Sequence, residues 1–240
     1  MTAELMHADF IFFDAFGTLF DFGQAANPPL DFQRLLAQND VVLPLEIVRT
    51  AIEQEMSHFR KWQKKVRNRA QLRELRLECA EITIAGLGGS KICSLEPDRV
   101  VELLVETFPN VVFADVEPAV QLARNRGIGV GVISNFSYML PIILEDLGLL
   151  NIFDVVAFSA ELGIEKPDPD IFCRAIEMAG GKGHSFAHIG DTYDEDVEGA
   201  RLANVNVVLL DRSGLSCRED VPVVTDLVEG VELLAGISRV

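Results

Sequence analysis

The stretch that decides the fold is FIFFDAFGTL, residues 10–19, near the start of the chain. Its first four residues are apolar, which is typical of a short strand buried on both faces of a sheet. Asp14 follows this run directly, and Gly17 and Thr18 come soon after, where a turn is favoured. The stretch therefore predicts a buried strand whose carboxyl end presents an aspartate.

The same arrangement, an apolar run that ends in polar residues, recurs twice in the second half of the chain. Residues 129–133 form a β-rich run that leads into Ser134 and Asn135, and residues 185–189 lead towards Asp191. Ligands of open parallel sheets bind outside the carboxyl ends of the strands. We therefore expect three separate segments to deliver polar groups to one crevice.

Strand-like and helical patterns alternate through this half of the chain. Further strands are predicted at residues 155–158 and 205–210, and the helical spacing of apolar residues predicts helices between the strands, at 118–125, 140–147, 170–179 and 197–203. Strands that alternate with helices indicate a parallel sheet covered on both faces. The predicted fold class is α/β, with a Rossmann-like parallel sheet as its core.

Residues 25–110 differ from the rest of the chain, because no clear strand pattern appears there. Apolar residues at helical spacing predict helices at 30–37, 45–59, 70–85 and 97–107. This stretch is interpreted as an insertion into the α/β fold. We predict an α/β core domain of residues 1–20 and 112–240, and an inserted α-helical domain of residues 21–111.

Composition narrows the classes of partner. Acidic residues outnumber basic ones by 37 to 21, and the formal net charge is -16. Nucleic acids and anionic membranes each need a positive surface, so neither is an expected partner. No basic leader precedes a long apolar run, and no apolar run approaches the ~20 residues of a membrane span. We expect a cytoplasmic protein that binds a small anionic substrate. A homodimer is an alternative to a monomer.

One basic segment stands out in this acidic chain. Six of the ten residues from 60 to 69 are Lys or Arg, and Trp62 lies among them. The segment is interpreted first as an exposed helix face. The alternative is that part of it overhangs the active site and attracts an anionic substrate, with Trp62 as an aromatic wall.

Four motifs, in order along the chain, resemble those of the haloacid dehalogenase superfamily. They are DAFGTL at 14–19, ISN at 133–135, KPDP at 166–169 and GDTYDED at 190–196. Each motif alone is a weak signal, but four in order, each in the right strand context, are specific. The resemblance covers residues 8–20 and 112–212, and it implies that the insertion is a helical cap.

The resemblance implies catalytic roles that the chemistry of the side chains supports. Asp14 would attack a phosphorus or carbon centre and form a covalent intermediate. Lys166 would keep Asp14 ionised and neutralise an incoming anion. Ser134 would donate its hydroxyl to substrate oxygens, and Thr18 would hydrogen-bond the same group. The backbone N–H of Asn135 would complete a small anion-binding nest.

The resemblance also implies a bound metal ion. In this family Mg²⁺ is held by the nucleophile, by the carbonyl of the residue two positions on and by an aspartate of the fourth motif. By position these are Asp14, the backbone of Phe16 and Asp191, and oxygen ligands suit Mg²⁺. The backbone N–H of Phe16 is also a candidate substrate-binding group. Asp196 is expected to orient Lys166 from behind, or to act as a further ligand.

The sequence departs from the phosphatase pattern at one position. Phosphatases of this superfamily usually carry a second aspartate two residues after the nucleophile, which protonates the leaving group. Here that residue is Phe16, which cannot transfer a proton. L-2-haloacid dehalogenases have an aromatic residue there, but their fourth motif carries Ser and Asn instead of Gly and Asp191. They also usually have Tyr where this chain has Phe172.

Three functions remain as alternatives. The leading one is a Mg²⁺-dependent phosphatase acting on a small phosphorylated metabolite. The second is an L-2-haloacid dehalogenase, and the third is a catalytically weak homologue that binds a ligand. A phosphonoacetaldehyde hydrolase ranks below these, because its Schiff-base lysine would have to come from the basic segment. His184 and His188 are expected to have structural roles, away from the motif-bearing ends of the strands.

Overall fold

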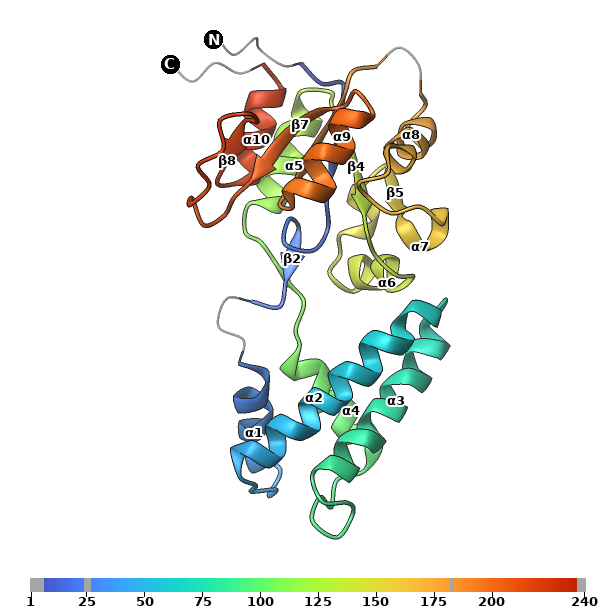
Figure 1. Ribbon diagram of the computed structural model, residues 1–240, viewed down its shortest axis with the longest axis vertical. Coiled ribbons are helices and arrows are strands. Elements are labelled where there is room, and N and C mark those ends of the chain that lie inside the picture. Colours follow the sequence, from blue (N-terminus) through green and yellow to red (C-terminus); the bar gives the residue numbers. More distant parts are fainter. Residues whose placement is uncertain (1–6, 24–26, 182–183, 237–240) are drawn as a thin grey trace. The chain divides into compact units, whose positions relative to one another are not determined.

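The computed structural model describes residues 7–23, 27–181 and 184–236. The chain forms two compact units (Figure 1). The core unit comprises Met1–Asp21, Val112–Phe136 and Ile143–Val240, and the helical unit comprises Phe22–Val111 and Ser137–Ile142. The division differs from the predicted domain boundaries chiefly at Ser137–Ile142, a segment that the sequence assigned to the core.

The core unit contains a six-stranded sheet in the order β5-β4-β1-β6-β7-β8. Every neighbouring pair of strands in it is parallel. The strands are β1 (Phe10–Phe13), β4 (Gly129–Ser134), β5 (Val155–Phe158), β6 (Phe186–Gly190), β7 (Asn206–Leu210) and β8 (Val223–Val224). The predicted α/β class is confirmed, as are the five predicted strands. β8 was not predicted, because two residues are too few for a periodic pattern.

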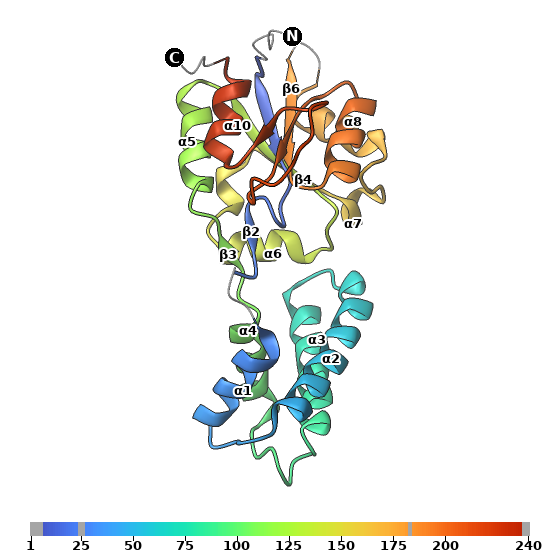
Figure 2. The same ribbon diagram turned by 60° about the vertical axis from the view of Figure 1, so that its left-hand side comes forward.

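Helices cover both faces of this sheet, as Figure 2 shows. α5 and α10 pack together on one face, and α8 and α9 pack together on the other. The helices are α5 (Val116–Asn125), α6 (Met139–Asp146), α7 (Ser159–Leu162), α8 (Pro169–Met178), α9 (Glu198–Leu202) and α10 (Leu227–Leu234). All four residues of β1 are buried, as its unbroken apolar run predicts.

One predicted helix begins differently in the structure. The helix expected at 197–203 is α9, and a π-helical turn, η3 (Tyr193–Val197), precedes it. The Asp196 N–H donates to the Thr192 carbonyl at 2.7 Å, and the Asp196 carboxylate accepts from the Thr192 N–H at 2.9 Å. These two bonds form a helical turn at residues 193–197. The helical backbone therefore begins before residue 197, where the helical spacing of apolar residues begins.

Between residues 27 and 110, the described part of the helical unit forms the four predicted helices. They are α1 (Pro28–Gln38), α2 (Leu45–Trp62), α3 (Arg69–Gly86) and α4 (Pro97–Thr107), with a 3₁₀ turn, η1 (Gln63–Lys65), after α2. No strand occurs between residues 27 and 110 of the described chain. Phe32, Leu36, Ile52 and Leu103 lie at the centre of its apolar core. Asn68 begins α3, because its side chain accepts a hydrogen bond from the Gln71 N–H.

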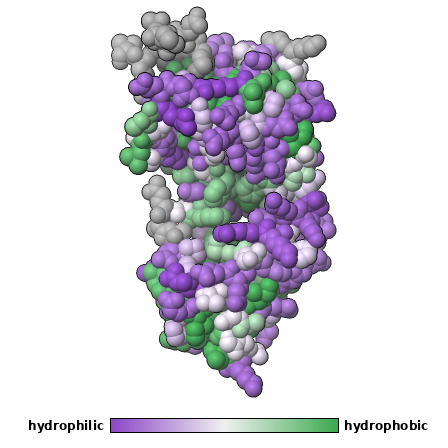
Figure 3. Space-filling view, viewed as in Figure 1, coloured by the Kyte–Doolittle hydropathy of each residue, from purple (hydrophilic) through white to green (hydrophobic). Residues whose placement is uncertain are grey.

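Both units have a largely hydrophilic visible surface in Figure 3, where hydrophobic residues appear as separate patches. This agrees with the excess of acidic residues in the sequence. No helix in the described ranges combines the length and apolar character that crossing a membrane requires.

Two short strands carry the chain between the units. β2 (Phe20–Asp21) and β3 (Val111–Val112) form a separate two-stranded sheet. The boundaries of the helical unit at residues 22 and 111 lie at these strands. The backbone is therefore paired at residues 20–21 and 111–112, where the two units divide.

Arg212, which follows β7, fastens the turn after β1. Its guanidinium donates to the carbonyls of Gly17 at 3.3 Å and Thr18 at 2.7 Å. It also pairs with both carboxylate oxygens of Asp115, at 2.8 and 3.1 Å, and lies 3.7 Å from the Phe113 ring centroid. One side chain thus ties the turn after Asp14 to the beginning of α5.

We predict that Arg212→Lys lowers the free energy of unfolding by about 1–3 kcal/mol, because an ammonium cannot reproduce the planar fork of bonds. Urea denaturation measures the loss. Arg124→Lys is the matched control, since Arg124 also pairs with both oxygens of an aspartate, Asp154, but at an exposed site. The control should cost less than about 1 kcal/mol. Equal losses in the two variants would contradict this account.

Candidate active site

The carboxyl ends of three adjacent strands deliver the expected polar residues to one edge of the sheet. β1 lies between β4 and β6, and Phe13 is in register with Val132 and Ile189. Asp14 therefore leaves β1 between Ser134, at the end of β4, and Asp191, which follows β6. The Asp14 N–H donates to the carbonyl of Ile189 at 2.9 Å, which holds the first residue of the turn against β6.

A buried lysine joins two of the carboxylates. Lys166 Nζ lies 2.6 Å from Asp14 Oδ1 and 2.5 Å from Asp196 Oδ1. The side chain of Lys166 is 1% exposed, and those of Asp14 and Asp196 are 10% and 1% exposed. Burial opposes the charge, but the two carboxylates raise the pKa of Lys166 above its usual value. The ammonium form is the one that this site holds.

The pKa values of the two carboxylates shift in opposite directions. Burial raises the pKa of Asp14, and the neighbouring Lys166 ammonium opposes that shift. Burial would also raise the pKa of Asp196, but the charge of Lys166 and a hydrogen bond from His188 hold it below its usual value. Asp196 is therefore the more firmly ionised partner of the lysine. This is the position expected for a residue that orients Lys166.

His188 was missed as part of this cluster. It lies inside β6, and its Nε2 is 2.8 Å from Asp196 Oδ1. The expectation that His188 lies away from the site was wrong, because η3 folds Asp196 back beneath the end of the strand. The available signal was a single polar residue within the otherwise apolar and glycine residues of 186–190. His184 lies before β6 and is exposed.

Asn135 connects two of the loops at the site. Its side-chain carbonyl accepts from the Lys166 N–H at 2.7 Å, and its amide donates to the Lys166 carbonyl at 2.9 Å. The same amide donates to Glu195 Oε2 at 2.9 Å. The side chain therefore holds the lysine loop, and the predicted contact with a substrate falls to the backbone N–H of Asn135.

Asp191 lies against the turn that follows β1. Gly17 has φ +85°, and a Cβ at this position would collide with the Asp191 carboxylate. The Thr18 hydroxyl lies 3.5 Å from Asp191 Oδ1, so Thr18 supports Asp191 at the limit of hydrogen bonding. Burial of the carboxyl, together with the charges of Asp14 and Asp196, raises the pKa of Asp191 to about 6. The residue nevertheless keeps access to solvent.

Negative charge exceeds positive charge at this edge of the sheet. The carboxylates of Asp14, Asp191 and Asp196 influence one another electrostatically, and Lys166 is the cation they share. Hard oxygen donors of this kind are the ligands that Mg²⁺ prefers, and it uses one or two carboxylates and keeps several waters. No group of three or more His, Cys, Asp or Glu side chains arranged to hold a metal occurs in the described part of the chain. The predicted ligand set has only two such side chains, Asp14 and Asp191, because its third ligand is the backbone carbonyl of Phe16.

The two other predicted site residues occupy different environments. Ser134 is buried at the end of β4. Phe16 is 38% exposed, and its ring packs edge-on against Phe20, with centroids 5.9 Å apart. Phe16 therefore presents an apolar surface two residues after Asp14.

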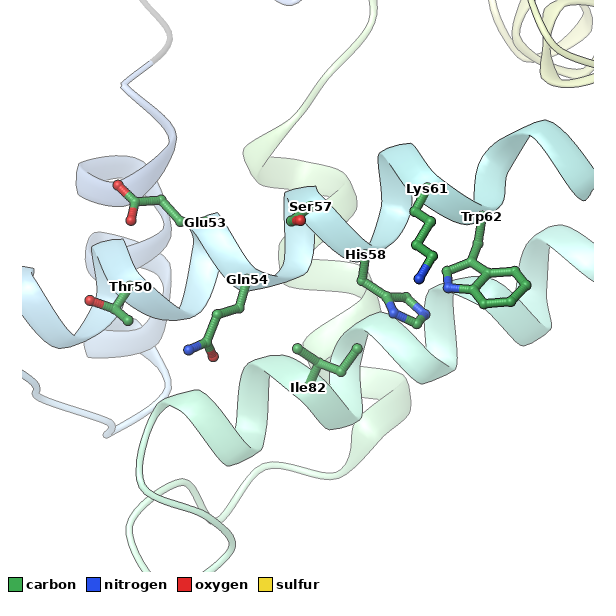
Figure 4. A pocket seen from close by; sticks show the side chains of 8 residues that line it. All are labelled: Thr50, Glu53, Gln54, Ser57, His58, Lys61, Trp62 and Ile82. Atoms are coloured by element: carbon green, nitrogen blue, oxygen red, sulfur yellow. The ribbon is translucent and has the colours of Figure 1, made fainter.

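The basic segment of the helical unit forms part of a shallow hollow. Lys61 and Lys65 place their ammonium groups 5.5 and 4.1 Å from the Trp62 ring centroid. Trp62, His58 and Ile82 line the hollow, which has a volume of about 480 Å³ and lies along α2 and α3 (Figure 4). Within this unit the Trp62 indole makes cation–π contacts with two lysines of the basic segment. The role of Trp62 as an active-site wall stays a prediction.

We predict that Gly17→Ala lowers the free energy of unfolding by about 2–4 kcal/mol, because backbone strain adds to a collision with Asp191. Gly127→Ala separates the two causes. Gly127 has φ +73°, but a Cβ there would meet nothing within 4 Å. The control should lose only the strain, about 1–2 kcal/mol. Urea unfolding of both variants provides the comparison, and equal losses would mean that the collision with Asp191 is unimportant.

A buried aspartate paired with a lysine at the carboxyl edge of a parallel sheet is an arrangement suited to an α/β enzyme that works through a carboxylate. The model of the haloacid dehalogenase-like hydrolases matches residues 8–204. The chain belongs to this family of hydrolases, which confirms the resemblance seen in the four motifs.

The curated proteins that this chain resembles in sequence carry different names. A haloacid dehalogenase-like hydrolase domain-containing protein 3 of Bos taurus is 39% identical over 41% of this chain and 39% of its own length. Phosphatase MT3486 of Mycobacterium tuberculosis is 38% identical over 42% and 48% of the two chains. A phosphoserine phosphatase of Thermus thermophilus is 34% identical over 48% and 49%. The matches span less than half of the length of each of these relatives.

Solved structures share the fold over nearly the whole chain. A HAD phosphatase from Thermococcus onnurineus has a TM-score of 0.58 and 21% identity, covering 96% of this chain and 99% of that one. A 2-haloacid dehalogenase from Pseudomonas syringae pv. Tomato has a TM-score of 0.59 and 22% identity, with the same coverage. Phosphatase and dehalogenase resemble this chain equally, so the likeness supports the fold and does not choose between the chemistries.

Proposed function

We propose that this hydrolase is a Mg²⁺-dependent phosphatase that acts on a small phosphorylated metabolite through an aspartyl-phosphate on Asp14. The observation that carries the proposal is the position of Asp191, whose carboxylate lies against the turn after Asp14. A third carboxylate there adds negative charge that a metal ion would balance. An unbalanced Asp191 would repel the carboxylate of a haloacid. The phosphatase names of two relatives support the same choice.

The residues of the chain divide the chemistry among them. Lys166 contacts Asp14 Oδ1, so the other oxygen, Oδ2, is the one that attacks phosphorus. The new bond joins Oδ2 to phosphorus, and the bond to the leaving oxygen breaks, with its electron pair going to the leaving group. Ser134 and the backbone N–H groups of Phe16 and Asn135 hold the phosphoryl oxygens. Water then cleaves the acyl phosphate and restores Asp14.

The ligands proposed for Mg²⁺ are Asp14, the carbonyl of Phe16 and Asp191. When bound there, Mg²⁺ supplies positive charge to the phosphoryl oxygens and offsets the repulsion between substrate and carboxylates. Lys166 remains with Asp14 and Asp196 and keeps both carboxylates ionised. We assign the helical unit the role of a cap that excludes water and selects the substrate.

We expect magnesium-dependent release of phosphate from an activated aryl phosphate. Asp14→Asn should lower kcat by at least about a thousandfold, because the amide is a far weaker nucleophile than the carboxylate. EDTA should abolish turnover and added Mg²⁺ should restore it. Asp191→Asn should raise the Mg²⁺ concentration needed for half-maximal rate. Asp170→Asn, at an exposed position on α8, is the control for loss of one charge.

Other outcomes of this assay would favour the alternatives. Halide release from 2-chloropropionate in EDTA, with no phosphate released from a panel of phosphorylated metabolites, would identify a dehalogenase. The apolar Phe16 is compatible with that reaction, because a halide leaves without a proton. Tight ligand binding that is indifferent to Asp14→Asn, without turnover of either kind, would identify a binding homologue.

Phe16 leads to a separate prediction about the leaving group. Since no acid follows Asp14 at the usual spacing, aryl phosphates should be hydrolysed far faster than alkyl phosphates. Phe16→Asp should raise kcat for alkyl phosphates by about 10²–10⁴-fold, which is the usual contribution of one general acid. It should change the hydrolysis of aryl phosphates little. Phe16→Leu is the control that changes size without adding an acid. A Leu variant with the same gain would show that removing the ring, and not adding a proton donor, is responsible.

A further inference from the structure

His188 is a fully buried polar residue, and only one of its two ring nitrogens forms a hydrogen bond with the described residues. Its Nε2 lies 2.8 Å from Asp196 Oδ1. Its ring packs edge-on against Phe172, with centroids 5.2 Å apart and an interplanar angle of 86°. Its other nitrogen, Nδ1, is buried and has no hydrogen-bond partner in the described residues.

Packing alone does not explain a histidine at this position. A buried polar atom without a partner costs free energy, and an apolar side chain would fill the same space without that cost. The neighbours of His188 in β6 are apolar or glycine, and its ring meets the apolar cluster that contains Phe172. The bond to Asp196 is therefore the feature that compensates for the unpartnered Nδ1. Because the Asp196 carboxylate accepts, the hydrogen of the imidazole is on Nε2.

The hydrogen bond between His188 and Asp196 affects how the Lys166 ammonium is shared between Asp14 and Asp196. Asp14 and Asp196 compete for the same ammonium, at 2.6 and 2.5 Å. Asp196 Oδ1 accepts from both Lys166 and His188, and Asp196 Oδ2 accepts from the Thr192 N–H at 2.9 Å. Each additional donor takes up part of the negative charge of Asp196 and fixes its orientation. Without His188, the carboxylate of Asp196 would draw Lys166 away from Asp14.

We propose that His188 is a positioning residue: by donating to Asp196, it keeps the Lys166 ammonium shared with Asp14. It does not touch the reacting atoms, and it acts through Asp196 and Lys166 in turn. The consequence for turnover rests on the proposed function, because Lys166 matters to the rate only if Asp14 attacks the substrate. The geometry of the lysine does not depend on that function.

The kinetic test compares two replacements of His188. His188→Leu fills the space without a donor, and His188→Gln places an amide N–H near the position of Nε2. We expect His188→Leu to lower kcat for an aryl phosphate about ten- to hundredfold, the size of one lost hydrogen bond to a charged group, with KM little changed. His188→Gln should recover most of the loss. Equal kcat in wild type and His188→Leu would overturn the proposal.

A second measurement does not rely on catalysis. In protein labelled with ¹⁵N-lysine, the Lys166 ammonium resonance reports whether the buried group stays fixed between its two carboxylates. We expect the resonance to shift or broaden in His188→Leu and to return in His188→Gln. If the wild type hydrolyses no phosphate ester, the proposed function fails, and this resonance still decides the role of His188. An unchanged resonance in His188→Leu would overturn the positioning role.

Val208→Ala is the matched control for a purely structural effect. Val208 lies in β7, in register with Ile189 of β6, and is fully buried. The variant should lower the unfolding temperature but leave kcat and the Lys166 resonance as in wild type. A comparable fall of kcat in Val208→Ala would show that loosening the sheet beside β6 is sufficient, and would overturn the specific role of His188.

Discussion

The buried ammonium of Lys166, held between Asp14 and Asp196, is the interaction on which the rest of the site depends. Removing charges from water is costly, and attraction between opposite charges offsets that cost only when the geometry is close and the remaining polar atoms are bonded. The site meets these conditions with lysine–carboxylate distances of 2.6 and 2.5 Å. Loss of the lysine would leave two carboxylates uncompensated in the interior.

The fold supplies this cluster from segments that are far apart in the chain. Asp14 leaves the central strand β1, Lys166 comes from the loop before α8, and Asp196 is turned back by η3. Glycine permits the close approach. A Cβ on Gly190 would collide with Asp196, just as one on Gly17 would collide with Asp191. The small residues of the first and fourth motifs thus make room for the carboxylates.

The same geometry explains why the nucleophile is easier to assign than its substrate. The environment of Asp14 suits attack by a carboxylate on either phosphorus or carbon, since neither needs a proton at that moment. The two chemistries diverge at the leaving group and at the metal. Phe16 withholds the proton that an alkoxide would need, whereas Asp191 adds the charge that a metal ion would balance. The proposed choice of activity therefore rests on two residues, Phe16 and Asp191, that lie beside an otherwise shared site.

The sequence by itself determined five strands of the core sheet, most helices and the residues at the strand ends. Apolar runs, helical spacing and motifs can each be recognised within a short stretch of sequence. The motifs also named Asp14, Lys166, Asp191 and Asp196 as candidate site residues. Only the tertiary structure decided the contacts among them. The π-helical turn brings Asp196 to His188, and the Asn135 side chain joins the Lys166 loop instead of facing a ligand. Such pairings depend on how turns and loops fold back on the strands, for which a single sequence carries no periodic signal.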